Sequence, residues 1–150
     1  MTDSEAMSAA LKLAEEAFSA DEVPVGCVIV NKEGRIIGSG RNRREELHDA
    51  TAHAEIEAIK NACLENRNWR LEDCSLYVTL EPCPMCTGAI IAARIPKVVF
   101  GARDSATGSC GSVIDLFSER YGHKPAVYAN VDSDSSIKLL QRFFSRKRNG

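Results

Sequence analysis

Residues 75–101 constrain the fold more than any other part of this sequence. Residues 75–80 are rich in β-branched and aromatic side chains and end just before a proline, which indicates a buried strand. A further proline favours the start of a helix over residues 85–94, and residues 97–101 have the apolar pattern of a second strand. Two neighbouring strands that are joined through a helix run parallel. Because helices must cover a parallel sheet, this segment predicts an α/β fold.

The remaining sequence adds a strand pair and further helices. Apolar spacing and turn signals predict strands at residues 25–30, 35–39 and 127–131, and helices at residues 4–20, 52–66 and 136–147. The four residues between the first two strands end in Gly34, which suits a hairpin turn. The order of elements predicts a three-layer α/β/α architecture around a mixed five-stranded sheet.

A single domain is expected over residues 1–150, because this length is near the commonest size of one domain. Thr2 and Glu5 have the spacing of a capping box at the start of the first helix. A basic helix is expected to close the domain over about residues 134–148. Its apolar spacing predicts that the inward face consists of Ile137, Leu140 and Phe144.

The composition argues against a disordered chain or a membrane protein. Hydrophobic residues make up 44% of the chain and charged residues 27%. No stretch approaches the ~18 uninterrupted apolar residues of a membrane-spanning helix. The N-terminal segment is acidic, whereas a signal peptide begins with basic residues. We therefore expect a cytoplasmic protein with no membrane partner, whose six cysteines are mostly free thiols.

The net charge of −2 hides an uneven distribution. Five of the 19 basic residues lie in the last thirteen positions, which leaves 14 basic against 21 acidic residues, or −7, over residues 1–137. A basic tail on an acidic body is able to contact phosphate locally, because exposed charges act over about one Debye length, roughly 8 Å. The alternative is a solvated helix end, where cations favourably face the helix dipole.

Three residues have the side chains and the placement of a catalytic zinc site. Cys83 and Cys86 lie three positions apart at the start of a predicted helix, where unpaired backbone N–H groups favour thiolate. His53 adds an imidazole at the start of another predicted helix. Three protein ligands leave one tetrahedral position of zinc open, which is typical of catalytic rather than structural sites. We therefore expect one Zn²⁺ per subunit.

Glu55 is the candidate proton carrier of this site. It lies two residues beyond His53, near the predicted metal. Two thiolates cancel the charge of Zn²⁺, so the metal lowers the pKa of its bound water less than a zinc ion held only by histidines would. A carboxylate base must therefore help to remove the proton. We expect Glu55 to move protons during hydrolytic loss of ammonia from an amidine-type carbon.

Each residue also has a simpler interpretation. Cys83 and Cys86 alone could form a redox pair, and the chain could bind no metal at all. A closed structural zinc site would need a fourth ligand, for which His48, His123 and Cys110 are the candidates. His53 and Glu55 alone are typical of ordinary residues in a first helical turn, but together with Pro82-Cys-x-x-Cys86 they favour a metal site.

Longer motifs carry a resemblance to a known family. The chain contains H-x-E at residues 53–55 and P-C-x-x-C at residues 82–86, the signature of zinc deaminases. Residues 23–26, 49–55, 76–83 and 100–108 resemble the bacterial tRNA-specific adenosine deaminases. The resemblance implies a cytidine deaminase-like fold and a zinc-containing homodimer. It also implies conversion of adenosine to inosine at the wobble position of a tRNA anticodon, typically of an arginine tRNA.

The resemblance also assigns substrate-binding residues. Asn42 would hydrogen-bond the flipped base, Ala54 would lie beside it, and Arg103 and Asp104 would contact the flanking nucleotides. Phe144 would stack on a base. The residues that would contact RNA phosphates are Arg146, Lys147 and Arg148.

These assignments have alternatives of their own. Asn42 could be a turn residue, and Arg103 with Asp104 could form a surface ion pair. Phe143 and Phe144 could both be core residues. The helix over residues 85–94 resembles the dimer face of the family but could equally belong to the core. Two other functions remain open: a deaminase of free guanine, cytosine or deoxycytidylate, and a zinc-bearing RNA-binding subunit without catalysis.

Overall fold

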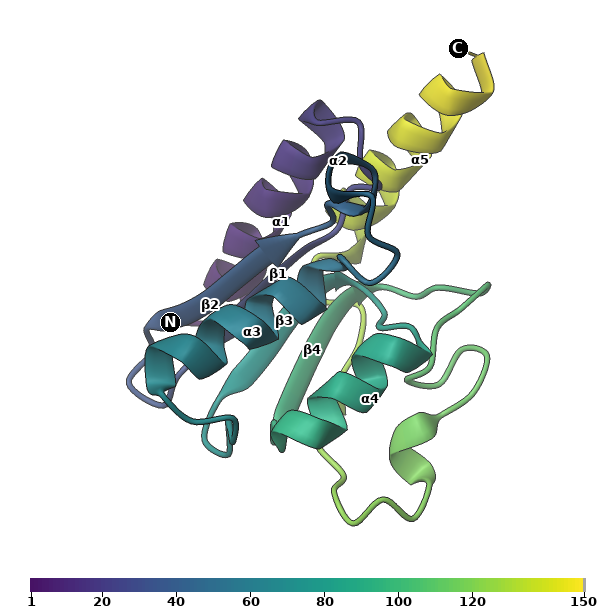
Figure 1. Ribbon diagram of the computed structural model, residues 1–150. Helices are drawn as coiled ribbons and strands as arrows, with labels where there is room; N and C mark the ends of the chain where they lie inside the picture. The colour runs from purple at the N-terminus through teal and green to yellow at the C-terminus, as the bar shows by residue number, and fades with distance from the viewer. Residues whose placement is uncertain (150) are drawn as a thin grey trace.

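A computed structural model describes residues 1–149 of the chain (Figure 1). The elements in chain order are α1 (Asp3–Ser19), β1 (Gly26–Val30), β2 (Ile36–Arg41), α2 (Arg44–Leu47), α3 (Ala54–Asn66), β3 (Ser75–Leu80), α4 (Pro84–Ala93), β4 (Lys97–Ala102), the short 3₁₀ helix η1 (Leu116–Ser118), β5 (Ala126–Tyr128) and α5 (Ser133–Asn149).

The five strands form one mixed sheet in the order β2-β1-β3-β4-β5. The β1–β2 hairpin is antiparallel, β1 pairs antiparallel with β3, and β4 pairs parallel with both β3 and β5. Since β2, β3 and β4 therefore point the same way, their carboxyl ends lie at one edge of the sheet. The predicted βαβ unit and the mixed five-stranded sheet are confirmed.

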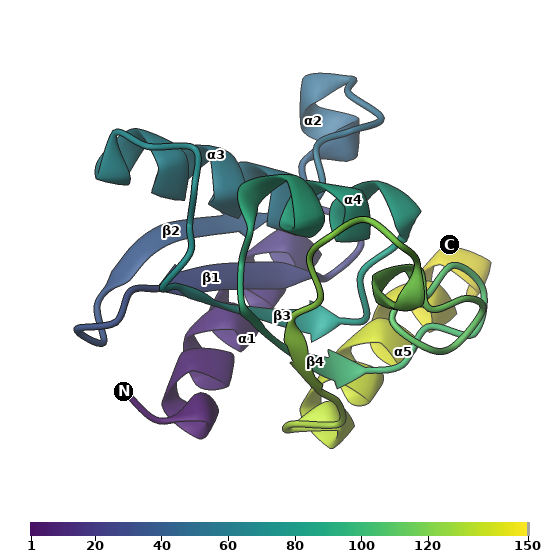
Figure 2. The same cartoon turned by 90° about the horizontal axis from the view of Figure 1, so that it is seen from below.

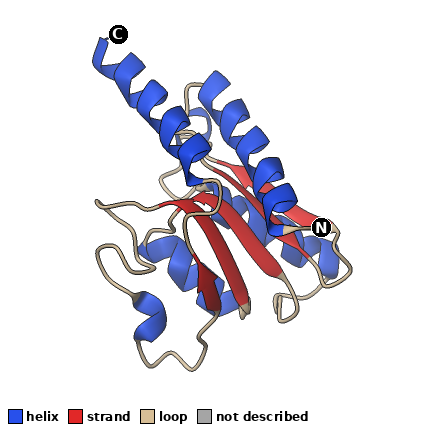
Figure 3. Ribbon diagram, turned by 180° about the vertical axis from the view of Figure 1, so that it is seen from behind, coloured by secondary structure: helices blue, strands red, loops and turns tan. Residues whose placement is uncertain are grey.

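Helices cover both faces of this sheet. Helices α3 and α4 lie on one face, and α1 and α5 lie on the other (Figures 2 and 3). Under α3 and α4, the larger apolar core includes Ile29, Leu76 and Phe100. Under α1, a second core joins Met7 to Tyr77 and other sheet residues. The predicted three-layer architecture is confirmed.

Helix α3 lies very close to the strand that precedes it. A Cβ atom at Gly40 would lie 2.5 Å from the carbonyl oxygen of Ala54 and 2.7 Å from Cβ of Glu57. Only glycine allows this approach, because real Cβ atoms do not come so near other heavy atoms. The close contact fixes the start of α3 against the end of β2.

The start of α1 is capped and tied to the sheet. Glu5 N–H donates to Thr2 Oγ1 and Thr2 N–H donates to Glu5 Oε1, so the predicted capping box is present. The carboxylate of Asp3 accepts from Lys97 Nζ at 2.9 Å and from the buried Tyr77 hydroxyl at 2.7 Å. These two hydrogen bonds, that from Lys97 foremost, lower the pKa of Asp3 below its ordinary value.

Two local predictions were wrong. The buried residues of α5 are Ser136, Leu139 and Phe143, one position before each residue of the predicted face. Ile137 and Phe144 are instead 39% and 44% exposed. The reason lies in α1, because the Phe143 ring packs edge-on against Phe18 at 6.2 Å between ring centres. In addition, the last strand covers Ala126–Tyr128 and not residues 127–131, and α2 lies in a segment for which the sequence predicted no element.

None of the helices in residues 1–149 combines the length and the apolar character that crossing a membrane requires.

Candidate metal and substrate site

Two helix starts bring the predicted metal ligands together. His53 is the N-cap of α3, and Cys83 is the N-cap of α4, which begins at Pro84 and is separated from the end of β3 by three residues. Cys86 follows within the first turn of α4 and is fully buried. Both helices begin at the edge where β2 and β3 end, so the three side chains meet although they come from distant parts of the sequence.

The distances between the ligand atoms suit zinc. His53 Nδ1 lies 3.6 Å from Cys83 Sγ and 3.5 Å from Cys86 Sγ, and all three ligand atoms lie within 4.8 Å of one another. Tetrahedral zinc with its usual Zn–N and Zn–S bond lengths separates N from S by about 3.6 Å. The geometry and the donor chemistry of the residues therefore fit the predicted metal.

The electrostatics of the two sulfurs also suit a cation. Hydrogen bonds from Cys86 and then His53 lower the pKa of Cys83 to about 4. The pKa of Cys86 is raised, because it is hydrogen-bonded to Cys83 and buried beside that thiolate. Two thiolates at this distance repel each other, so a divalent cation between them is what allows both to ionise.

None of the three candidate fourth ligands lies with His53, Cys83 and Cys86, so the described residues do not form a closed four-ligand site. Among residues 1–149, only His53, Cys83 and Cys86 gather as potential metal ligands. Cys110 Sγ lies 3.7 Å from Thr87 Oγ1, and His123 Nε2 donates to the carbonyl of Ile95 at 2.7 Å. The third candidate, His48, is an exposed residue at the end of α2.

Glu55 lines a cavity of about 140 Å³ together with two of the ligands, His53 and Cys83. It belongs to the first turn of α3 and is 4% exposed. Burial, foremost, raises the pKa of Glu55 to about 7. The structure thus places the predicted proton carrier beside His53 and Cys83 in one cavity.

Asn42 joins the loop after β2 to the start of α3. Its side-chain oxygen accepts a hydrogen bond from the backbone N–H of Ala54 at 2.9 Å. Asn42 is buried and lines the cavity of Glu55, whereas the side chain of Ala54 is fully buried outside its lining. Asn42 therefore caps a helix from a distance and is more than a turn residue.

Arg103 and Asp104 do not form the ion pair considered above. The Asp104 carboxylate accepts hydrogen bonds from Ala106 N, Thr107 N and Thr107 Oγ1, which closes a tight turn. Asp104 and Thr107 line the cavity. The exposed Arg103 instead places its guanidinium over the Phe100 ring, 5.6 Å from the ring centre.

The C-terminal helix presents only part of the predicted RNA surface freely. Phe143 is core, whereas Phe144 is exposed. Arg146 and Lys147 both bind the carboxylate of Asp21, at 3.1 and 2.6 Å. Arg148 is exposed.

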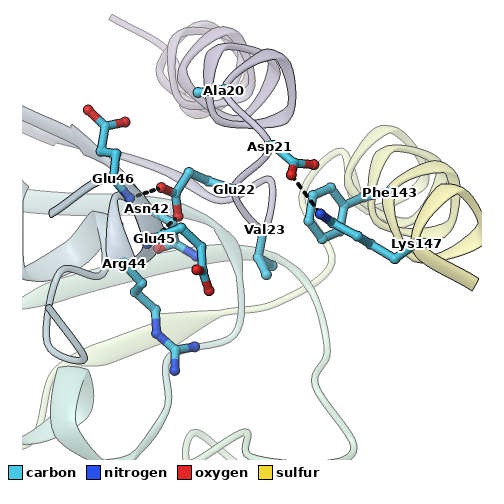
Figure 4. Close-up of a pocket in the computed structure, with 10 residues that line it drawn as sticks. All are labelled: Ala20, Asp21, Glu22, Val23, Asn42, Arg44, Glu45, Glu46, Phe143 and Lys147. Carbon is cyan, nitrogen blue, oxygen red and sulfur yellow. Dashed lines mark hydrogen bonds and ion pairs between the residues drawn. The ribbon is translucent and has the colours of Figure 1, made fainter. Parts of the chain in front are cut away.

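A second, larger cavity of about 590 Å³ adjoins the first and shares Val23, Asn42 and Arg44 with it. Figure 4 shows Asp21 and Lys147 on one side of it and α2 on the other. Sequence reasoning missed this cavity because its wall depends on Glu22. The buried Glu22 carboxylate accepts from the backbone N–H groups of Glu45 and Glu46 and so holds α2 in place.

Glu81 is the other residue that sequence reasoning did not single out. It is buried between β3 and Cys83, lines the smaller cavity and accepts hydrogen bonds from the loop after β4. Burial alone would raise its pKa, but hydrogen bonds from Ser112 and from backbone N–H groups hold the pKa of Glu81 below its ordinary value. An acidic residue at the end of a buried strand was the available signal.

Comparison with known proteins identifies the family. Residues 1–102 match the cytidine and deoxycytidylate deaminase zinc-binding region. A tRNA-specific adenosine deaminase of Aquifex aeolicus is 44% identical over 143 residues, which cover 95% of this chain and 94% of that relative. The chain belongs to the tRNA-specific adenosine deaminase family.

Two further matches to this adenosine deaminase chain are a longer protein, of which the chain spans only a part, and a solved structure. A tRNA(Ile)-lysidine synthase of Deinococcus deserti is 46% identical over 143 residues, and the chain spans only 27% of the length of that relative. A solved structure from a study of A-to-I editing by tRNA:A34 deaminases superposes with a TM-score of 0.87 at 43% identity, covering 91% of this chain and 99% of the other. The family, the fold and the zinc-ligand set predicted from the sequence are thus confirmed.

Proposed function

We propose that this protein hydrolyses adenosine to inosine at the wobble position of a tRNA anticodon. One observation carries the chemistry: a buried glutamate lines a cavity of about 140 Å³ together with His53 and Cys83, two members of a ligand set that fits zinc. Zinc deaminases need this combination to attack the amidine-type carbon of a base. The similarity to tRNA-specific adenosine deaminases over most of the chain supports the substrate class.

The proposed mechanism uses Glu55 as the proton carrier. Bound by His53, Cys83 and Cys86, zinc would supply a Lewis acid that makes water nucleophilic near neutral pH. The Glu55 carboxylate takes a proton from water as the oxygen bonds to C6 of adenine, and delivers it to N1. A second proton passes through Glu55 to the amino group, which leaves as ammonia. Adenosine and water thereby give inosine and ammonia.

Asn42 and Ala54 would orient the base beside these groups. The side-chain oxygen of Asn42 is used by the N–H of Ala54, so we assign its amide NH₂ to the base. Because an anticodon loop offers bases that unstack at low cost, a flipped adenine can enter the small cavity while the rest of the loop stays outside. The adjoining cavity of about 590 Å³ offers space for a flanking nucleotide.

The RNA surface would extend from Arg103 and Asp104 to the end of α5. Exposed Phe144 is available to stack on a base, for about 1–3 kcal/mol. The phosphate contacts assigned to α5 are Arg146, Lys147 and Arg148, and we propose an arginine tRNA as the natural substrate. Lys147 lines the larger cavity, which supports its contact with RNA near the site.

We further propose a cytoplasmic homodimer with one Zn²⁺ per subunit. The six cysteines are free, which suits a reducing compartment. On α4, Ile90 and Ile91 belong to the core and cannot form the dimer face. Exposed Met85 remains for it, together with exposed Val113 of the loop after β4. Sedimentation of the purified chain tests the dimer, and a monomer at micromolar concentration would exclude it.

The direct test of the proposed function is to sequence inosine in tRNA after incubation with the purified, zinc-loaded chain. We expect inosine at position 34 of an anticodon stem-loop that carries adenosine there, and none in a stem-loop with guanosine at that position. Adenosine, guanine and cytosine are assayed in parallel. Efficient turnover of a free base without RNA would instead establish the small-molecule deaminase.

A further inference from the structure

The buried carboxylate of Glu81 accepts several hydrogen bonds from segment 104–112, a loop that forms part of the cavity wall. Glu81 Oε1 accepts from the backbone N–H of Asp104 at 3.1 Å, and Oε2 accepts from those of Cys110 at 3.0 Å and Ser112 at 3.1 Å. The Ser112 hydroxyl also donates to Oε1. Four donors thus converge on a single side chain from both ends of the segment 104–112.

The loop is shaped to receive this carboxylate. A Cβ atom at Gly108 would lie 2.5 Å from Cδ of Glu81 and 2.6 Å from its Oε1. Glycine at position 108 therefore leaves the space that the carboxylate occupies. The loop also closes on itself through Gly108 N–H, which donates to the carbonyl of Asp104 at 2.9 Å.

The same segment forms one wall of the cavity that holds Glu55. Asp104 and Thr107 line that cavity, and their side chains are hydrogen-bonded to each other. Glu81 itself lies two residues before Cys83 but outside the ligand group. A single side chain thus connects the end of β3, next to the metal ligands, with the loop that borders the substrate.

From this geometry we propose that Glu81 is a positioning residue, which holds segment 104–112 in the shape that admits the substrate base. The proposal rests on the proposed function, because it concerns how that same cavity binds its base. Glu81 acts through the loop and does not touch the reacting atoms. Its loss should therefore affect substrate binding more than the chemical step.

The test compares wild type with Glu81→Gln, in which an NH₂ donor replaces one oxygen and faces backbone N–H groups. Losing charge-assisted hydrogen bonds of this kind is expected to raise KM for an anticodon stem-loop about tenfold, with kcat changed less than about threefold. Zinc content should stay at the wild-type level. Amide hydrogen exchange at Asp104, Cys110 and Ser112 should accelerate about tenfold while that of α3 does not change.

The test includes two further variants, a control at an exposed glutamate and a milder change of the same hydrogen-bond network. Glu119→Gln changes an exposed glutamate beyond the loop and should leave all these quantities at wild-type values. Ser112→Ala removes one donor, keeps the carboxylate, and should raise KM about twofold with faster exchange at Ser112. If Glu81→Gln does not fold, Ser112→Ala alone decides. Unchanged KM and exchange in the folded variants would overturn the proposal, as would an equal loss of kcat, whereas an inactive wild-type chain would contradict the proposed function instead.

Discussion

Asn42 Oδ1 lies 2.9 Å from the backbone nitrogen of Ala54, so the loop after β2 caps the helix that carries His53 and Glu55. The first N–H groups of a helix have no partner within it, and here a side chain twelve residues upstream supplies one. The N-cap residue His53 makes no such hydrogen bond with its own side chain. This leaves the imidazole of His53 to face the two sulfurs.

Removing this cap should destabilise the fold measurably. Asn42→Ala leaves a buried N–H without an acceptor, and we expect a loss of about 1–2 kcal/mol in the free energy of unfolding. The matched control is Asn61→Ala, which removes a hydrogen bond to the Ser39 carbonyl from an exposed asparagine. Urea unfolding measures both, and equal stabilities of the two variants would contradict the capping role.

Glu55 should be required for turnover but not for metal binding. Glu55→Gln keeps the size of the side chain but cannot accept and return protons, so kcat should fall at least about a hundredfold. Zinc content, measured by atomic absorption, should match the wild type. Glu65→Gln, at the exposed far end of α3, serves as the control. An unchanged yield of inosine from Glu55→Gln would remove this residue from the mechanism.

Asp21 should restrain the cations of α5. Its carboxylate holds Arg146 and Lys147, and the hydrogen bond from Lys147, foremost, lowers the pKa of Asp21. If Arg146 and Lys147 contact RNA as proposed, RNA phosphates must compete with this carboxylate. Because Asp21 has a positive φ of 61°, which asparagine tolerates well, Asp21→Asn releases the cations with little backbone strain.

We expect Asp21→Asn to bind an anticodon stem-loop several-fold more tightly at low salt. Its salt dependence should be steeper, by up to about 0.7 for each additional phosphate that the released cations bind. Fluorescence anisotropy at several salt concentrations measures this. Asp73→Asn breaks a single, longer ion pair with Lys32 at 3.9 Å, removes the same charge and should bind as the wild type does. Weaker binding by Asp21→Asn would show that the carboxylate assists RNA recognition.

The Asp3 cluster predicts a pH dependence of stability. The pKa of Asp3 is lowered in the folded state, so its contribution to stability is present above the unfolded-state value and is lost as the pH falls through the folded-state value. Asp3 is partly exposed, which limits the contribution to less than about 1 kcal/mol. Asp3→Asn should therefore be slightly less stable than the wild type at pH 7 in urea unfolding. The difference should shrink below pH 3.8, and a constant difference would contradict the assignment.

The zinc ligands could be predicted because their signal is local. Cys83 and Cys86 share one helical turn, and His53 lies at another helix start that the apolar pattern already indicated. The rotation of α5 could not be predicted in the same way. Ile137 and Leu139 offer two competing apolar faces, and contact with Phe18, far away in the sequence, decides between them.

Long-range hydrogen bonds explain the other omissions. Helix α2 is too short to have an apolar repeat, and its backbone is held by Glu22, which lies more than twenty residues upstream. Likewise, the basic residues Arg146 and Lys147 are visible in the sequence, but their pairing with Asp21 is not. Charge counts indicate which residues are able to bind phosphate and not which of them are already engaged.

In this fold the helix starts hold the metal ligands and the loops form the walls of the cavity, and this separation affects how substitutions could change the substrate. The imidazole and the sulfurs are fixed by α3 and α4 against the sheet. The cavity walls are instead held by hydrogen bonds to two buried carboxylates: Glu22 holds α2, and Glu81 holds segment 104–112. Substitutions within α2 or segment 104–112 can therefore alter which nucleobase fits without disturbing the metal ligands. Such a scaffold can acquire a new substrate through its loops alone, while the reaction itself is inherited intact.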